Sequence, residues 1–302
     1  MRSLRQFGAG LTGSAAIAAL ILACGGHSSG PTAPGNGSGG GTGSNPGTNT
    51  PPVIDSITPS STRIEVGTPV TLTAAVTDAE TAVSSLTFKW TADNGTFNGS
   101  GATVTWQPSA DAATPADYSL TLTVTENYTS AGQPLTNTAS KTISVHVNNS
   151  PKELADLSMR FLTNFGDSNV SPATCVSEFS DSCSGKSAEL SDITDNRHDF
   201  QILDRTLRPT SVDIASSQTS ATVHTFCAFT SRVITTQPQS GGCLASPGAC
   251  PFNSVQNVKG DCYTTNVYEA GRWRLCTSHF TPQSGSSAFA RAFFGSRLSY
   301  PH

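Results

Sequence analysis

The stretch Val70-Thr71-Leu72-Thr73-Ala74-Ala75-Val76-Thr77 alternates larger apolar side chains with Thr or Ala. Successive side chains of a β-strand point to opposite faces, so this pattern predicts a strand with one face in a core. Similar alternating runs continue to residue 147, separated by turn residues such as Asp93-Asn94-Gly95. The segment 53–148 is therefore predicted to be an all-β sandwich of short strands.

This segment resembles the bacterial immunoglobulin-like and PKD-like repeats. The resemblance rests on residues 66–73, on the strand 88–90 with residues 95–97 after it, and on residues 118–124. It implies an immunoglobulin-like sandwich in which Trp90 packs in the core. The resemblance implies no catalytic activity, and the segment contains no cysteine, so apolar burial alone is expected to stabilise it.

Asp78 and Glu80 lie where related repeats often carry an acidic turn that sometimes binds calcium. Here Ala79, Thr81 and Ala82 interrupt the carboxylates, whereas Ca²⁺ takes six to eight oxygen ligands. We therefore predict no metal site and no cofactor.

The beginning of the chain, residues 1–23, predicts a signal peptide. Arg2 and Arg5 precede an apolar stretch that is short for a membrane-spanning helix, which needs about 20 apolar residues. The following Cys24, preceded by Ile21-Leu22-Ala23, resembles the bacterial lipobox. The resemblance implies lipid transfer to the Cys24 thiol and cleavage before it. An ordinary cleaved signal, in which Cys24 is incidental, is the alternative.

Residues 24–52 are expected to comprise the lipidated cysteine and a disordered tether. The tether is expected to be disordered because Gly, Ser, Thr, Pro and Asn dominate it, so that little apolar surface is available to bury. The chain is then an envelope protein whose first partner is the membrane, through a lipid anchor. Gly25 in place of Asp favours the outer membrane, by resemblance to lipoprotein sorting rules. Nucleic acid is not an expected partner, because 17 Lys and Arg are scattered among 21 Asp and Glu.

The segment 150–302 predicts a second, α+β domain. Ser150-Pro151-Lys152-Glu153 reads as a capping box that opens a helix with apolar residues at helical spacing, and shorter helices are expected from Ser171 and Ser187. Antiparallel strands are then expected at residues 201–207, 212–214, 219–236, 258–270 and 272–281. The fold class is multidomain: an immunoglobulin-like sandwich, then a disulfide-bearing domain with N-terminal helices and a curved antiparallel sheet.

The order of elements, with residues 200–203 and 267–276, resembles the cone-shaped fold of the NTF2-like superfamily. The resemblance covers about residues 151–281. That superfamily contains enzymes, binding modules and scaffolds, so the resemblance implies a fold and does not choose a function.

Seven of the eight cysteines fall in this second domain. They are Cys175, Cys183, Cys227, Cys243, Cys250, Cys262 and Cys276. In an exported protein they predict disulfides rather than a metal site, because no CxxC pair or paired His spacing accompanies them. Since seven is odd, one thiol is expected to stay free or to link two molecules.

Two cysteine pairs are close enough in sequence to close local loops. One is Cys175 with Cys183, and the other is Cys243 with Cys250. A hairpin turn at Ala270-Gly271 would set Cys262 and Cys276 on opposite faces of the sheet, so that Cys227 bonds one of them but not both.

The ionisable residues that a catalytic cone can use are scattered. They are His198, Asp199, Asp204, His224, Glu269 and His279. Each has a plainer explanation: His198 and Asp199 are expected to end a helix in solvent, and Asp204 and Glu269 to point outward or to pair with nearby Arg. We retain Asp204, His224 and His279 as weak catalytic candidates.

The order of signal, tether, sandwich and terminal domain favours a lipid-anchored envelope protein that presents an interaction or small-ligand-binding domain on a spacer. Its partner would be an envelope protein or a small ligand. The alternative is an isomerase, dehydratase or hydrolase that uses a carboxylate or His in the cone. A purely structural role, with the free thiol linking two copies, is a third possibility.

Overall fold

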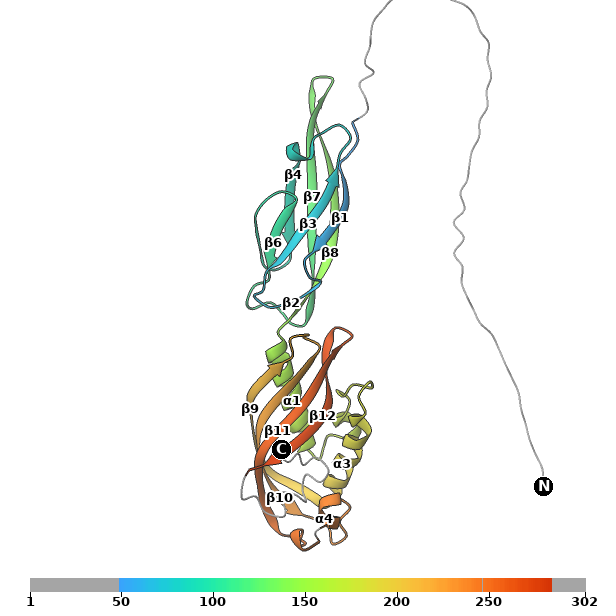
Figure 1. Cartoon of the computed structure of the whole chain (residues 1–302). Coiled ribbons are helices and arrows are strands. Elements are labelled where there is room, and N and C mark those ends of the chain that lie inside the picture. Colours follow the sequence, from blue (N-terminus) through green and yellow to red (C-terminus); the bar gives the residue numbers. More distant parts are fainter. Residues whose placement is uncertain (1–48, 246, 284–302) are drawn as a thin grey trace, which may run out of the picture. The chain divides into compact units, whose positions relative to one another are not determined.

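The computed structural model describes residues 49–245 and 247–283 (Figure 1). The predicted signal peptide, Cys24 and most of the tether lie outside the described residues. The described part is rich in β-structure, with three sheets and few helices. The coarse prediction of a multidomain, β-rich chain with disulfides is therefore confirmed.

The first part is a β-sandwich of two four-stranded sheets. One sheet has the order β1-β3-β6-β5 and the other β2-β8-β7-β4. The strands are β1 (Val53–Pro59), β2 (Arg63–Glu65), β3 (Val70–Thr77), β4 (Thr87–Ala92), β5 (Thr96–Asn98), β6 (Thr103–Gln107), β7 (Ala116–Ser130) and β8 (Gln133–Asn148), and a short 3-10 helix η1 (Val83–Ser85) precedes β4. All neighbouring strands are antiparallel except β2 and β8, which are parallel.

The alternation of larger apolar side chains with Thr or Ala in residues 70–77 explains how β3 contributes to the sandwich core. In β3 every second residue is buried and the others are exposed, because one face of the sheet meets the other sheet. Trp90 packs against this core but stays partly exposed, and its indole N–H donates to the Gly101 carbonyl. The fully buried indole is Trp106, which donates to the Asn94 carbonyl at 2.9 Å.

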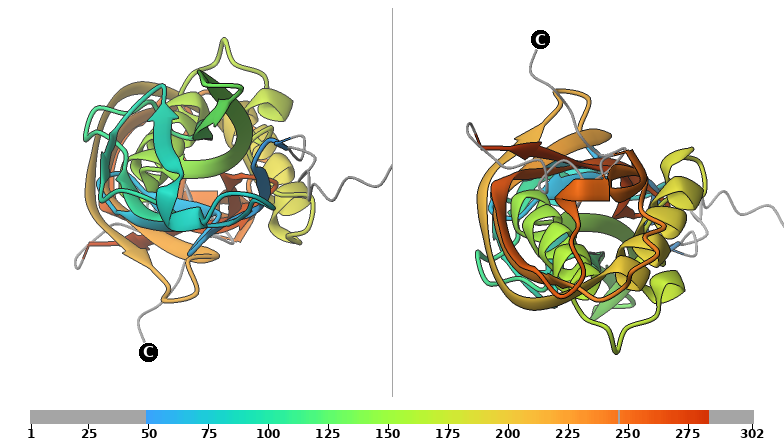
Figure 2. Two further views of the ribbon diagram at one scale, coloured as in Figure 1. Left: turned by 90° about the horizontal axis from the view of Figure 1, so that it is seen from above. Right: turned by 90° about the horizontal axis from the view of Figure 1, so that it is seen from below.

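The second part, called the C-terminal domain here, begins at residue 150. Its antiparallel sheet has the order β12-β11-β10-β9. The elements are α1 (Ser150–Phe165), α2 (Pro172–Cys175), α3 (Gly185–Asp199), β9 (Phe200–Ile214), β10 (Ser220–Val233), α4 (Gly241–Ala245), a 3-10 helix η2 (Pro247–Ala249), β11 (Val255–Glu269) and β12 (Arg272–Pro282). Figure 2 shows this sheet curling around α1.

Helix α1 buries one apolar face against the inner face of the sheet. Leu154, Leu157 and Phe161 recur at helical spacing and are almost fully buried. The predicted cap is wrong by one residue: Asn149 is the N-cap, and its side chain accepts from the Lys152 N–H. Ser150 is instead bound by the sandwich, since its N–H and hydroxyl both donate to Glu65 of β2.

Strand β9 is longer than the sequence predicts, whereas β10 is shorter than the predicted 219–236. Residues 201–207 and 212–214 form the single strand β9, because a bulge at Thr210 absorbs the irregular spacing around Pro209. The hairpin prediction is confirmed: Glu269 pairs with Arg272 and Tyr268 with Trp273. Below these pairs Leu275 opposes Asn266 and Thr277 opposes Thr265, so Cys276 is an extra, bulged residue on β12.

Candidate functional site

A cavity of about 410 Å³ lies where α1 ends, α3 ends and β9 begins. Its walls are about half apolar, and the apolar part comes from Phe165, Phe200, Ile202 and Ile234. The polar side chains of Ser168, Asn196, Arg197 and Gln201 complete the lining. This volume and this mixture of walls are typical of small-ligand pockets.

Helix α1 and strand β9 lie very close together at the end of α1 that borders the cavity. Gly166 is the C-cap of α1, and a Cβ there would lie 2.8 Å from Nη1 of Arg205. The same Cβ would lie 3.4 Å from Cδ1 of Ile202, which lines the cavity. A glycine at this position therefore lets β9 pack directly beside the helix end.

Arg197 fixes the loops on one side of the cavity. Its guanidinium donates to the carbonyls of Val170 and Asn164, and one nitrogen lies 3.1 Å from the Cys175 sulfur. The Nε of Arg197 and the Oδ1 of Asn196 are buried and have no hydrogen-bond partner among the described residues. These atoms add unused hydrogen-bonding capacity to two residues of the cavity lining.

Cys175 is the one cysteine in the described residues that forms no disulfide, and it is buried. Burial raises the pKa of its thiol, although the neighbouring Arg197 acts in the opposite direction. A protonated, inaccessible thiol is a poor nucleophile. Cys175 therefore has the environment of a core residue and not of a reactive one.

His224 and His279, two of the three catalytic candidates, meet on the outer face of the sheet. Tyr263 lies between them, opposite His224 in the β10–β11 register and opposite His279 in the β11–β12 register. Its ring centroid is 5.5 Å from the His224 centroid and 5.0 Å from that of His279, and the three rings are nearly parallel. The sheet thus stacks one tyrosine between two imidazoles.

Two carboxylates flank His224. Asp261 approaches Nδ1 at 2.7 Å, and Asp213 lies 3.9 Å from Nε2. Asp261 also borders a shallow hollow of about 340 Å³ beside Phe226 and Pro282. An Asp–His pair can orient a proton acceptor, but this one lies on a half-exposed face rather than in an enclosed pocket.

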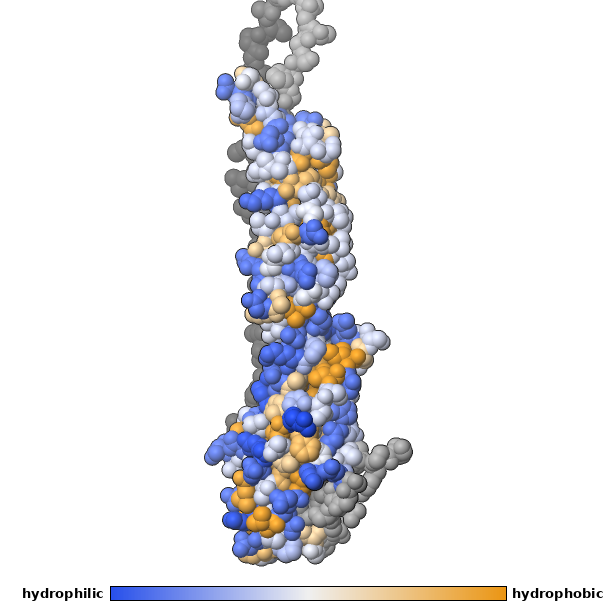
Figure 3. All heavy atoms as spheres, turned by 90° about the vertical axis from the view of Figure 1, so that its left-hand side faces the viewer, coloured by the Kyte–Doolittle hydropathy of each residue, from blue (hydrophilic) through white to orange (hydrophobic). Residues whose placement is uncertain are grey.

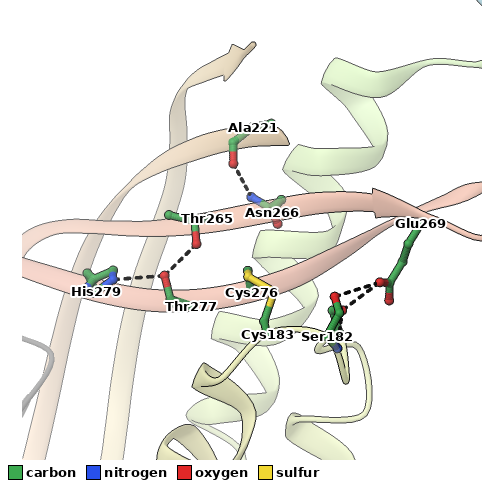
Figure 4. The surroundings of a disulfide bond; sticks show 10 residues. Ser182, Cys183, Ala221, Thr265, Asn266, Glu269, Cys276, Thr277 and His279 are labelled. Atoms are coloured by element: carbon green, nitrogen blue, oxygen red, sulfur yellow. Dashed lines mark hydrogen bonds between the residues drawn. A yellow bond between two sulfur atoms is a disulfide. The ribbon is translucent and has the colours of Figure 1, made fainter. Parts of the chain in front are cut away.

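Other predicted residues lie elsewhere. Asp204 is exposed on β9, opposite Thr230, away from His224 and His279. Glu269 accepts hydrogen bonds from the hydroxyls of Ser180 and Ser182 rather than pairing with Arg (Figure 4).

The prediction that Asp199 ends a helix in solvent is wrong. Its side chain is fully buried and accepts from the backbone N–H groups of Gln239 and Ser240. Burial by itself would raise the pKa of this carboxyl, but hydrogen bonds from Ser240, His198 and Gln239 outweigh it, so the pKa is lowered. Asp199 thereby ties the end of α3 to the loop that leads into α4.

Three disulfides are formed in the C-terminal domain. They are Cys183–Cys276, Cys227–Cys262 and Cys243–Cys250. The local pair Cys175–Cys183 is wrong, because the segment before α3 runs along β12 and Phe179 bridges to Leu275, which brings Cys183 to the bulged Cys276 (Figure 4). Cys227 bonds Cys262 and not Cys276, in line with the alternatives left by the hairpin.

Within the described residues no three His, Cys, Asp or Glu side chains are placed to hold a metal ion. In the same part of the chain no helix is long and apolar enough to cross a membrane.

Sequence reasoning missed the cavity residues Asn196 and Arg197. No signal in the sequence marks them, because both lie near the end of the predicted third helix, where polar residues are ordinary. Nothing in that pattern distinguishes an Arg that holds two loops from one in solvent, so the tertiary contacts were needed to find it.

No protein-family model matches the chain, and no curated protein matches it. Solved structures with partial similarity include a conserved protein from Planctomyces limnophilus, 16% identical, which covers 44% of this chain and 96% of that chain with a TM-score of 0.30. A putative scytalone dehydratase from Novosphingobium aromaticivorans is 15% identical over 42% of this chain and 83% of its own, also with a TM-score of 0.30. A protein of unknown function from Mycobacterium tuberculosis is 12% identical, covering 47% and 82%, with a TM-score of 0.30. Similarities of this size establish no shared activity.

Proposed function

We propose that this chain is a lipid-anchored envelope protein whose C-terminal, NTF2-like domain binds a small amphipathic ligand. The immunoglobulin-like sandwich would serve as the spacer that carries the binding domain. The lipobox-like residues before Cys24 support the anchor, and the Gly- and Ser-rich stretch after it supports a tether. In this proposal the protein belongs to the cell envelope, on the outer membrane.

The observation that carries the proposal is the cavity at the end of α1. Phe165, Phe200, Ile202 and Ile234 give it apolar walls, and Ser168, Asn196, Arg197 and Gln201 give it polar ones. A ligand with both an apolar part and a polar part matches this lining.

The placement of the titratable groups favours binding over acid–base catalysis. No Asp, Glu or His is among the described residues that line the cavity. Asp204, His224 and His279 lie on strands outside it. A general acid or base must reach the substrate, and these three do not reach a ligand held in this cavity.

The experiment is a titration of the full chain with 1-anilinonaphthalene-8-sulfonate, an apolar fluorescent probe with one anionic end. We expect saturable fluorescence enhancement by the native protein and loss of most of it in an Ile234→Trp variant, whose larger ring fills the cavity. The native Ile234 side chain is 43% exposed, so this change should leave the fold intact.

Val255→Trp is the matched control, because Val255 is 49% exposed and does not line the cavity. Probe binding that persists unchanged in Ile234→Trp, or that is lost equally in Val255→Trp, would contradict the cavity as the binding site. Circular dichroism of each variant checks that the fold is preserved.

A further inference from the structure

Large apolar side chains are exposed at one end of the C-terminal sheet. Leu244 and Phe252 are each 60% exposed, Val255 is 49% exposed, and Ile234 and Leu203 are each 43% exposed. Isolated exposed apolar residues are ordinary, whereas apolar residues that gather into one patch make a candidate interaction surface.

The strand register places these residues together. Gln201 of β9 lies opposite Arg232 of β10, and Arg232 lies opposite Val255 of β11. Leu203 follows shortly after the start of β9, Ile234 follows the end of β10, and the loop with Leu244 and Phe252 joins β10 to β11. Figure 3 shows apolar side chains gathered on the surface at this end of the domain.

The same segment carries no charge. Residues 233–258, 26 in succession, contain no Asp, Glu, Lys, Arg or His. No other stretch within residues 49–283 is as long without a charged residue, and its composition removes the desolvation cost that buried charges would bring on contact with an apolar phase. Arg232 and Lys259 flank the span on the outer face of the sheet, with Asp204 nearby as an acidic residue.

The loop is held in shape by covalent and hydrogen bonds. Cys243 and Cys250 are joined by a disulfide, with their Cα atoms 5.8 Å apart. The Asp199 carboxylate fixes the residues before α4 from the other side. The disulfide thereby restrains the positions next to Leu244 and Phe252, which lowers the entropy lost on binding.

The apolar end also borders the cavity. Ile234 is exposed in this surface and lines the cavity, and Phe200 and Gln201 line it from the start of β9. An apolar ligand that dissolves in membranes rather than in water would enter the cavity beside this surface.

We propose that the end formed by Leu203, Ile234, Leu244, Phe252 and Val255 docks on a lipid surface, with Leu244 and Phe252 inserted among the acyl chains. Arg232 and Lys259 then face anionic headgroups. The choice of ligand class rests on the proposed binding function: the cavity takes an amphipathic lipid directly from that surface. The docking itself requires only the exposed, uncharged loop and its basic flanks.

The test is flotation of the full chain with vesicles of phosphatidylethanolamine and phosphatidylglycerol, using a Cys24→Ser background so that no lipid anchor contributes. We expect the double variant Leu244→Ser, Phe252→Ser to lose at least about tenfold in vesicle partitioning, since it removes two large apolar side chains from the inserted surface. Replacing phosphatidylglycerol with phosphatidylcholine should weaken binding by about fivefold for each of the two flanking cations.

Leu135→Ser with Val53→Ser is the matched control, because those residues are 44% and 53% exposed but lie in the sandwich. Equal loss in the control, or no binding by the parent chain, would overturn the proposal. It would also fall if sedimentation showed that the parent is a dimer and the Leu244/Phe252 variant is a monomer, because the surface would then join two copies of the chain. Ser168→Trp separates the two proposals, because Ser168 lines the cavity but does not belong to the docking surface: it should reduce uptake of the fluorescent probe and leave vesicle binding intact.

Discussion

The guanidinium carbon of Arg63 lies 3.5 Å from the centre of the Tyr268 ring, so a β2 side chain of the sandwich covers an aromatic ring of the β11–β12 hairpin. The same guanidinium donates to the Gln218 carbonyl at 2.8 Å and to Oδ1 of Asn148 at 2.8 Å. The Tyr268 hydroxyl also donates to Asn148, at 2.9 Å. One arginine thus joins the sandwich to two turns of the C-terminal domain.

Removing this arginine should uncouple the two parts of the chain. We expect Arg63→Ala to cost about 2 kcal/mol, from the lost cation–π contact and the unpaired acceptors, and to separate one urea transition into two. Arg160→Ala is the control, because its ion pair with Glu178 is largely exposed and should contribute under about 1 kcal/mol. A single unshifted transition in Arg63→Ala would show that the contact contributes nothing.

Arg63→Lys should recover only part of the stability. Lysine keeps the charge but lacks the planar fork that stacks on Tyr268 while donating to Gln218 and Asn148. We expect a midpoint between those of the parent and Arg63→Ala in the same urea titration. Full recovery would mean that charge alone, without the stacked geometry, holds the junction.

Acid should weaken the loop before α4 through Asp199. A carboxyl whose pKa is lower in the folded than in the unfolded chain stabilises the fold above the unfolded pKa, near 3.9, and this stabilisation is lost as the pH falls through the folded pKa. We expect Asp199→Asn to cost about 1–3 kcal/mol at pH 7 and less at about pH 3, which lies below the unfolded pKa. Urea unfolding at both pH values measures the difference. A cost independent of pH would refute the role of the ionised carboxylate.

Cys175 should react only after unfolding. Because the thiol is buried and its pKa is raised, native protein should be alkylated by iodoacetamide far more slowly than the same protein in guanidinium chloride. Mass spectrometry without reductant should then find one modified cysteine in the C-terminal domain. Non-reducing electrophoresis should show no disulfide-linked dimer, and a dimer that disappears in Cys175→Ser would contradict the buried placement.

The disulfides should differ in their effect on stability. Cys183–Cys276 spans 93 residues and Cys243–Cys250 spans 7, so loop entropy predicts losses of about 4.7 and about 2.4 kcal/mol when each pair is replaced by serine. Calorimetry of the two double variants tests this order. The Cys243/Cys250 variant should in addition bind vesicles less well, since the loop carrying Leu244 is no longer pre-organised.

The local pattern of the chain was enough to predict many elements. Period-two alternation identified β3, and residue spacing around Ala270-Gly271 placed the β11–β12 hairpin in its observed register. These features depend on residues a few positions apart, which the sequence shows directly. The free thiol was expected from the odd number of cysteines, but its identity was not.

Long-range contacts decided the rest. The sequence by itself determined the strands, helix α1 and the supply of disulfide-forming cysteines, because backbone periodicity and side-chain chemistry act locally. Only the tertiary structure decided that Cys183 meets Cys276, that Asp199 is buried under Ser240, and that Asn196 and Ile234 share a cavity. Each of these depends on how residues far apart in the chain pack against one another, which no local pattern in the sequence reports.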